Sequence, residues 1–161
     1  MLATTIGWRE WVALPELGVA SIKAKIDTGA RSSSLHAWDV RIVEGNGRGP
    51  RVPRVRFVLH PRQRDMAETV EAEADLVAMR AVRSSNGEVE NRPVIRTPLV
   101  LDGHRYAIEL TLTRRDQMGF RMLLGRRAVR RRFVIDPGRS FLSGGSTVDP
   151  SSLVGPGAAT I

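Results

Sequence analysis

Short runs in which apolar and polar residues alternate dominate the chain, and a period of two is typical of half-buried β-strands. The clearest run covers residues 18–26, where a set that includes Ile22 and Ile26 is expected to face inward. Similar runs predict strands at residues 11–14, 34–38, 52–59, 97–101, 106–113, 120–124 and 133–136. Residues 69–79 fit a strand or a helix, although their alternating glutamates favour a strand, and residues 126–132 predict a short helix. The pattern therefore predicts a mostly β domain with one short helix.

Turn-forming residues separate these runs and indicate how neighbouring strands connect. Asn86-Gly87 and Asp102-Gly103 each lie between two extended runs. Such pairs predict β-hairpins, because both central positions of a type I′ turn need positive φ. The glycine-rich segment at residues 45–50 is expected to form a loop.

The length of 161 residues suits one domain, or one domain with a tail. From residue 142 onward Gly, Ser and Pro dominate and the periodicity ends. We therefore expect a single domain over residues 1–141 and a flexible C-terminal tail over residues 142–161. The chain has no cysteine, which excludes disulfides and thiolate metal sites and fits a reducing compartment. It has no signal-peptide pattern and no run near about 18 apolar residues, so we expect a cytoplasmic protein that does not enter a membrane.

The chain is strongly basic, since its 25 Lys and Arg against 17 Asp and Glu give a net charge of +8. This charge favours acidic partners such as an acidic peptide, nucleic acid or an anionic membrane surface, although a solvated basic surface is an equally simple interpretation. Because arginine binds carboxylates and phosphates alike, composition does not choose among these partners. Aromatic residues make up only 5% of the chain, so stacking platforms for nucleic acid look sparse and that partner is less favoured.

Residue patterns for metal or nucleotide chemistry are missing from the sequence. The three histidines, His36, His60 and His104, are widely spaced and lack the His-Glu-x-x-His arrangement of zinc peptidases. The glycine-rich segment at residues 45–49 lacks the lysine of a phosphate-binding loop. We therefore expect no metal and no cofactor.

One segment combines an apolar strand with a carboxylate in a tight turn, namely Asp27-Thr28-Gly29-Ala30 after residues 22–26. Gly29 has no Cβ, so another backbone or a substrate can approach closely. The Thr28 hydroxyl can fix the turn, and Ala30 is small enough to leave the site open. Asp27 is therefore a candidate catalytic residue, and the alternative is a carboxylate that only stabilises its turn.

This segment resembles the active-site loop of the retropepsin-like aspartic peptidases. Met122-Leu123-Leu124-Gly125-Arg126 resembles the apolar-apolar-Gly-Arg element that packs beneath that loop in the family. Further segments resemble a bacterial group often labelled ATP-dependent zinc proteases, and these are residues 7–12, 14–18, 23–31, 33–37 and 121–126. The resemblance covers residues 7–140 and implies a closed, six-stranded acid-protease barrel.

The resemblance also implies catalytic roles for Asp27, Thr28 and Gly29. Aspartic peptidases need two carboxylates that share one proton, and the chain has a single Asp-Thr-Gly. A symmetric homodimer with one Asp27 from each subunit is therefore expected. The Asn86-Gly87 hairpin lies where the family has a flap, which would close over substrate. Compared with retroviral proteases, the spacing from Asp27 to the Gly-Arg element is longer, and the excess falls around residues 39–80.

One position departs from the viral pattern, since Arg31 stands where viral members have an aspartate that pairs with the Arg of the Gly-Arg element. Arg31 and Arg126 would then be like charges near each other, and we expect both to bind an acidic substrate. For Arg126 the simpler alternative is that it only ties the loop down. Ala30, Asn86 and Gly87 complete the expected substrate-binding set.

Relatives in this family are associated with ligases that add glutamate to ribosomal protein tails. The resemblance therefore implies an acidic protein substrate, such as a glutamate-modified ribosomal protein. The alternative is a non-catalytic basic module of the same fold that binds an acidic peptide or nucleic acid, because a fold does not fix a function.

Overall fold

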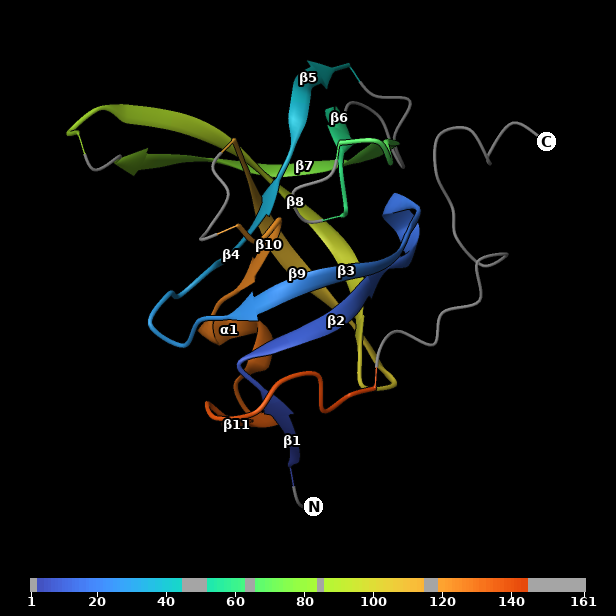
Figure 1. The fold of residues 1–161 in the computed structure, drawn as a ribbon. Coiled ribbons are helices and arrows are strands. Elements are labelled where there is room, and N and C mark those ends of the chain that lie inside the picture. The colour runs from blue at the N-terminus through green and yellow to red at the C-terminus, as the bar shows by residue number, and fades with distance from the viewer. Residues whose placement is uncertain (1–2, 45–51, 63–65, 84–85, 115–118, 145–161) are drawn as a thin grey trace.

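The structure is a computed structural model that describes residues 3–44, 52–62, 66–83, 86–114 and 119–144 (Figure 1). Strands make up most of the described chain, as the alternating pattern predicted. The strands are β1 (Thr4–Gly7), β2 (Arg9–Leu14), β3 (Val19–Ile26), β4 (Ser33–His36), β5 (Trp38–Val43), β6 (Arg54–Leu59), β7 (Val70–Arg83), β8 (Val89–Leu101), β9 (His104–Thr113), β10 (Met122–Leu124) and β11 (Phe133–Asp136). The described helices are the short 3-10 turn η1 (Pro15–Leu17) and α1 (Arg126–Val129).

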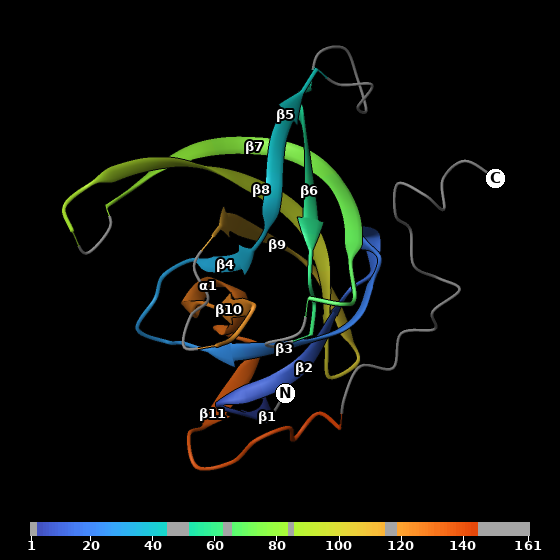
Figure 2. The same cartoon turned by 45° about the horizontal axis from the view of Figure 1, so that its top comes forward.

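Six strands form a closed barrel. They are hydrogen-bonded in the order β2-β3-β10-β4-β9-β8, and Ala13 on β2 pairs with Val100 on β8 to complete the ring (Figures 1 and 2). Closure leaves these strands without free edges over the paired region. The six-stranded barrel implied by the family resemblance is therefore confirmed.

The barrel interior is filled by the inward-facing residues of the alternating strands. On β3, Ile22 and Ile26 are buried, whereas Lys23 and Lys25 are partly exposed, as the sequence pattern predicted. Leu110 of β9 belongs to the same core. Each fully buried aliphatic side chain contributes roughly 1.5–3 kcal/mol to folding. The core thus fixes which residues of β3 and β9 point outward.

Three further strands extend the sheet beyond the barrel, in the order β8-β7-β6-β5. They contain the excess residues that the sequence placed around positions 39–80. Residues 69–79, which fitted either state, lie almost entirely in the long strand β7. Arg54 on β6 forms ion pairs with Glu73 and Asp75 on β7 at 3.2 and 2.6 Å, which ties this extension together. Figure 2 shows β7 curving with β8 above the barrel.

Both predicted hairpins are present, but only one has the predicted turn. Asp102 and Gly103 have φ values of 51° and 76° and connect the paired residues Leu101 and His104, as in a two-residue loop. The last described β7–β8 pair instead joins Arg83 and Val89, a register that is centred on Asn86. Gly87 has φ 88°, but a two-residue turn at Asn86-Gly87 would be centred between these two residues rather than on Asn86. The type I′ prediction at Asn86-Gly87 was therefore wrong.

Other boundaries differ from the predictions in small ways. The helix predicted over residues 126–132 ends at Val129, and Arg131 has φ 66°, which a right-handed helix does not accommodate. The strand predicted at residues 34–38 is divided at Ala37 into β4 and β5. Strand β1 was not predicted, and it pairs in parallel with β11. The structure describes no helix with the length and apolarity needed to cross a bilayer.

The start of the predicted C-terminal tail contacts the barrel through a buried carboxylate. Glu10 on β2 is fully buried, and its oxygens accept hydrogen bonds from the backbone N–H groups of Gly7, Leu142 and Ser143. The Ser143 hydroxyl donates to the same carboxylate. Residues 145–161 of the predicted tail lie outside the described residues. The chain is thus held at the barrel through residue 143.

Candidate active site

Asp27 lies directly after the last residue of β3, and a neighbouring strand supports it from below. Its backbone N–H donates to the carbonyl of Leu124 on β10 at 2.8 Å. Strand β10 runs parallel to β3, with Leu124 opposite Ile26, and antiparallel to β4, with Met122 opposite Leu35. The strand therefore lies between the two ends of the loop that carries Asp27.

The Asp27 loop is a tight turn closed by its own carboxylate. Asp27 Oδ1 accepts a hydrogen bond from the Gly29 N–H at 3.0 Å, and the Ala30 N–H donates to the Asp27 carbonyl at 3.2 Å. A Cβ at position 29 would lie only 3.2 Å from Asp27 Oδ1. Glycine therefore leaves the carboxylate uncrowded, and Thr28 and Gly29 are exposed.

The Asp27 carboxylate is partly exposed and is not neutralised by a cation. Within the part of the chain that the structure describes, no Lys or Arg side chain forms an ion pair with it. The carboxylate therefore retains an oxygen that can face a substrate, water or a second carboxylate. This arrangement differs from that of a purely structural ion-pairing aspartate.

The Gly-Arg element fits against the loop with no space to spare. The Gly125 N–H donates to the Ser33 hydroxyl at 3.0 Å, and the Arg126 N–H donates to the Ala30 carbonyl at 2.7 Å. A Cβ at Gly125 would overlap the carbonyl of Ser32. Glycine at this position therefore allows the close approach of the two backbones. The Ser33 hydroxyl thus supports the loop.

Arg126 ties the loop down, which was the simpler of its two predicted roles. Its Nη1 donates to the Thr28 carbonyl at 3.1 Å, so the guanidinium bridges α1 and the turn. Arg31 is exposed, and its carbonyl accepts a hydrogen bond from the Arg127 N–H at 3.2 Å. Both arginine side chains are exposed beside the loop. Their binding of an acidic substrate stays a prediction.

Asn86 and Gly87 lie at the tip of the long β7–β8 hairpin. Both are exposed, and Asn86 Oδ1 accepts a hydrogen bond from the Glu88 N–H at 3.2 Å. Figures 1 and 2 show this tip and the loop after β3 on the same side of the molecule. The hairpin tip therefore lies on the side of the molecule that carries the Asp27 loop, and its role as a flap over substrate stays a prediction.

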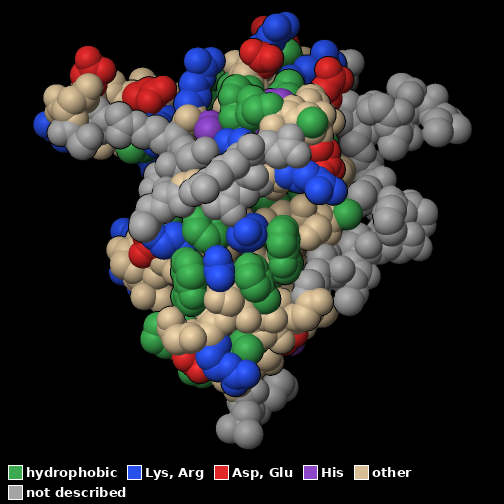
Figure 3. All heavy atoms as spheres, viewed as in Figure 1, with side chains coloured by type: hydrophobic (Ala, Val, Ile, Leu, Met, Phe, Trp, Pro, Cys, Tyr) green, Lys and Arg blue, Asp and Glu red, His purple; other side chains and the backbone are tan. Residues whose placement is uncertain are grey.

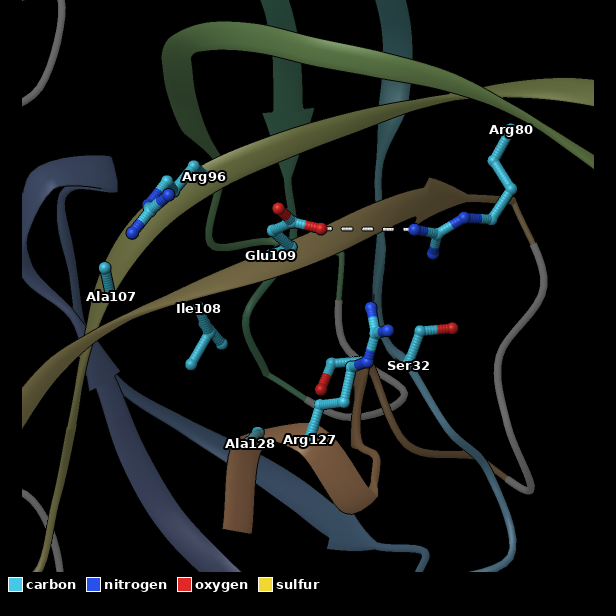
Figure 4. A pocket seen from close by; sticks show the side chains of 9 residues that line it. Ser32, Arg80, Arg96, Ala107, Ile108, Glu109, Arg127 and Ala128 are labelled. Atoms are coloured by element: carbon cyan, nitrogen blue, oxygen red, sulfur yellow. Dashed lines mark ion pairs between the residues drawn. The ribbon is translucent and has the colours of Figure 1, made fainter. Parts of the chain in front are cut away.

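Sequence reasoning missed three arginines that line a pocket next to the loop. Arg80 on β7, Arg96 on β8 and Arg127 on α1 surround Glu109 of β9 (Figure 4). These residues are far apart along the chain, and only the pairing of the strands brings them together. An available signal was Arg96 itself, an exposed cation between the buried Ile95 and Thr97.

The histidines and tryptophans mainly pack. His36 is buried and stacks on Trp38 with ring centroids 3.9 Å apart, and Trp38 meets His60 edge-on at 4.5 Å. His104 instead lies against Phe133. Among the described residues, no three His, Asp or Glu side chains gather in a way that could hold a metal ion.

Aromatic rings and cations also pack together on the face formed by β2 and β3. The guanidinium carbon of Arg9 lies 4.7 Å from the Trp8 ring centroid and 4.9 Å from that of Phe141. Trp11 stacks on Phe141, with Lys23 Nζ 5.4 Å from the Trp11 ring. Figure 3 shows hydrophobic and basic side chains intermixed over the middle of this face. Trp8 and Trp11 thus anchor neighbouring segments.

Comparison with known proteins places the chain in a family. The model of the RimB-like family, described as retropepsin-like aspartic endopeptidase RimB, matches residues 5–145. A crystal structure of the Legionella pneumophila protein Lpg0085, of unknown function, superposes with a TM-score of 0.68 and 26% identity. That match covers 87% of this chain and 98% of the Legionella chain.

Similar curated proteins carry a different name and are much longer. A probable alpha-L-glutamate ligase of Shewanella halifaxensis is 46% identical over 139 residues, which are 86% of this chain and 30% of the relative. A protein of the same name from Desulfotalea psychrophila is 44% identical over 82% of this chain and 28% of its own length. The chain thus spans less than a third of the length of these relatives. With the family model matching most of its length, the chain belongs to the RimB-like family of retropepsin-like aspartic endopeptidases.

Proposed function

We propose that the chain is an aspartic-type endopeptidase that acts as a homodimer, with one Asp27 from each subunit at the two-fold axis. The observation that carries the proposal is the placement of Asp27. Its carboxylate lies on an accessible turn, supported by Leu124 and Arg126, without a cation partner among the described residues. A single Asp-Thr-Gly in the sequence requires a second copy to supply the other carboxylate.

The chemistry follows from two carboxyl groups that share one proton. Like charges about 3 Å apart do not readily both ionise, so the reactive form of the pair holds one shared proton. The ionised Asp27 takes a proton from water as the water oxygen forms a bond to the peptide carbonyl carbon. The protonated Asp27 of the other subunit donates its proton to the carbonyl oxygen. When the tetrahedral intermediate collapses, the C–N bond breaks and the leaving nitrogen takes the proton now held by the first Asp27. One gem-diol hydroxyl returns its proton to the Asp27 of the other subunit as the new carboxyl group forms.

The gem-diol intermediate has no metal ion to stabilise it in this scheme. The two carboxyl groups supply the hydrogen bonds instead. The Gly29 N–H already holds Asp27 Oδ1, which leaves Oδ2 for water or the second carboxylate. The β7–β8 hairpin would cover the substrate and exclude bulk water during the reaction.

We propose an acidic or glutamate-extended protein tail as the substrate. The net charge of +8 and the exposed Arg31 and Arg126 beside the loop favour a chain of carboxylates. The curated relatives named alpha-L-glutamate ligase contain a similar segment within a longer chain. A peptidase joined to such a ligase could remove what the ligase adds, and a glutamate-modified ribosomal protein is one candidate.

Cleavage and assembly are tested together. Sedimentation should give a dimer under the conditions of activity, and a glutamate-extended peptide should be cleaved between about pH 4 and 8, the range over which a carboxylate pair titrates. The Asp27→Asn variant should lose at least about 100-fold in kcat/KM. Asp136→Asn is the matched control, because Asp136 Oδ1 accepts the Gly138 N–H at 3.0 Å in the same Asp-x-Gly turn.

Other results would contradict the proposal of a dimeric peptidase or favour the non-catalytic alternative. An active monomer, or an Asp27→Asn variant that cleaves as fast as Asp136→Asn, would contradict the proposal. Binding of the peptide without cleavage by any variant would instead favour the non-catalytic module of the same fold.

A further inference from the structure

A basic pocket lies next to the catalytic loop, between the flap hairpin and α1. It has a volume of about 240 Å³, and its lining includes Ser32, Arg80, Arg96, Ile108, Glu109 and Arg127. Figure 4 shows Glu109 between the side chains of Arg80 and Arg96, with Arg127 extending from α1 toward the same space. Residues from β7, β8, β9, α1 and the loop after Asp27 therefore converge there.

The charges of the pocket do not balance. Three guanidinium groups face one carboxylate, so the lining has a net charge of +2 (3 − 1). The Arg80–Glu109 ion pair is long, at 4.0 Å, and Arg80 also donates to the Thr111 hydroxyl at 3.2 Å. Within the described ranges, the side chains of Arg96 and Arg127 have neither a hydrogen bond nor an ion pair. Their donors are free to bind an anion.

The base of the pocket is apolar and its geometry is fixed. Ile108, Ala107 and Ala128 contribute hydrocarbon surface beneath the charges, which strengthens electrostatic attraction relative to open water. The Tyr106 hydroxyl donates to the Ala128 carbonyl at 2.7 Å, so β9 and α1 are held at a fixed separation. The helix that carries Arg127 is thereby anchored beside Glu109.

We propose that this pocket binds a carboxylate side chain of a peptide that lies between the flap hairpin and the catalytic loop. Glu109 occupies the place of that carboxylate in the free protein, and the incoming group replaces it as a partner of Arg80. The Arg127 N–H is bonded to the Arg31 carbonyl, so the pocket is continuous with the loop that holds Asp27. The assignment rests on the proposed function in that the bound peptide is the substrate.

Carboxylate rather than phosphate is favoured by the residue already present. Glu109 is a tethered carboxylate among the three arginines, and a guanidinium fork matches the two oxygens of such a group. The pocket thus selects a glutamate or aspartate at one position of the peptide.

Binding is measured in the Asp27→Asn background, so that cleavage plays no part. Tetraglutamate is titrated calorimetrically at low salt, with tetraglutamine as the uncharged control peptide. The Arg96→Gln/Arg127→Gln double variant should bind tetraglutamate at least about tenfold more weakly, or about 1.4 kcal/mol. The matched control is Arg56→Gln/Arg105→Gln, which removes two exposed arginines outside the pocket and should change binding by less than about twofold.

The Glu109→Gln variant tests whether Glu109 competes with the bound peptide for the pocket arginines. Glu109→Gln should tighten tetraglutamate binding by about threefold, because the internal competitor is gone. Glu16→Gln removes the carboxylate of the Arg105–Glu16 pair elsewhere on the surface and should leave binding unchanged. A net-charge effect would move both variants equally and would overturn the assignment.

Each remaining outcome is also decisive. Equal losses in the two double variants, no binding by the parent protein, or tighter binding of inorganic phosphate than of tetraglutamate would overturn the carboxylate pocket. If tetraglutamate binds as expected while no glutamate-extended peptide is cleaved by the wild-type protein, the peptidase proposal fails and the pocket stands. If peptides are cleaved but the pocket variants bind tetraglutamate as tightly as the parent protein, the pocket proposal fails and the peptidase proposal stands.

Discussion

The Gly125 N–H donates to the Ser33 hydroxyl at 3.0 Å, which joins two positions 92 residues apart in the chain. This contact and the adjacent Arg126–Ala30 backbone hydrogen bond hold the far side of the Asp27 loop, while the Asp27 N–H bond to the Leu124 carbonyl holds its start, so both ends rest on residues 124–126. The geometry of the carboxylate therefore depends on a residue that has no side chain at all.

Replacing Gly125 with alanine should destabilise the protein by about 1–3 kcal/mol, because the new Cβ would overlap backbone atoms of Ser32 that belong to the loop. Gly138→Ala is the control, since a Cβ there would have its nearest contact at an ordinary 3.5 Å. Urea unfolding of both variants measures the difference. Equal stability of the two would show that the loop yields to the added methyl group.

Asp27→Asn should leave the free energy of unfolding within about 0.5 kcal/mol of wild type while abolishing cleavage. The asparagine Oδ1 can still accept the Gly29 N–H, and no ion pair among the described residues is lost. Thermal unfolding and peptide cleavage on the same samples separate the two effects. A loss of several kcal/mol would mean that Asp27 has a structural role.

Glu10→Gln should cost about 2–3 kcal/mol, because the amide nitrogen replaces an acceptor that several N–H groups share. Burial by itself would raise the pKa of Glu10, but hydrogen bonds from Ser143, Gly7 and Leu142 outweigh it and lower the pKa below its ordinary value. A lowered folded pKa gives stability that is fully present above the ordinary pKa of 4.5 and is lost as pH falls through the folded value.

The stability gap between wild type and Glu10→Gln should therefore be widest near neutral pH and narrow below about pH 4. Urea unfolding at several pH values measures it, with the exposed Glu16→Gln as control. A gap that stays constant down to pH 3 would show that ionisation of Glu10 contributes nothing.

Tyr106 is the only tyrosine of the chain, so its ionisation can be followed by absorbance. Burial raises its pKa to about 12, although the nearby Arg132 acts in the opposite direction. Phenolate absorbance should rise near pH 12 in the folded protein and near pH 10 in urea. Because the unfolded state loses this proton first, stability should fall as pH rises from about 10 to 12. If Tyr106 titrated at the same pH in the folded protein and in urea, burial would not be raising the pKa of its hydroxyl.

Arg31→Gln should weaken binding of an acidic peptide without changing stability, because its exposed guanidinium has no partner within the described chain. Arg126→Gln should weaken binding and also loosen the loop, since Arg126 donates to the Thr28 carbonyl. Peptide titration measures the loss of binding in each variant. Hydrogen exchange at residues 28–30 measures loosening of the loop, which is expected only in Arg126→Gln. Faster exchange in Arg31→Gln than in Arg126→Gln would reverse the two roles.

Local patterns predicted most of the barrel. Alternation along β3 correctly assigned Ile22 and Ile26 to the core, and Asp102-Gly103 adopts the positive φ values of its predicted turn. The family resemblance supplied the closed topology and the pairing of β10 with the Asp27 loop, which periodicity does not encode. Local signals failed where tertiary contacts decide, as at β1, which exists because it pairs with β11.

The site was predictable only where its residues are contiguous. Asp27, Thr28 and Gly29 form one turn, so the sequence displays them together. Arg80, Arg96 and Arg127 come from three separate elements, and their shared pocket depends on the register of β7 and β8. The roles of Arg126 could not be separated from the sequence, because its hydrogen bond to a backbone carbonyl needs no particular partner side chain.

The insertion of β10 between β3 and β4 has a consequence for biosynthesis. The ribosome produces Asp27 early, but residues 122–126, on which its turn rests, are translated much later. A growing chain therefore carries the carboxylate without its scaffold, and pairing across such a long sequence separation is slow to form. The Asp27 turn can therefore reach its folded arrangement only after synthesis has passed Arg126.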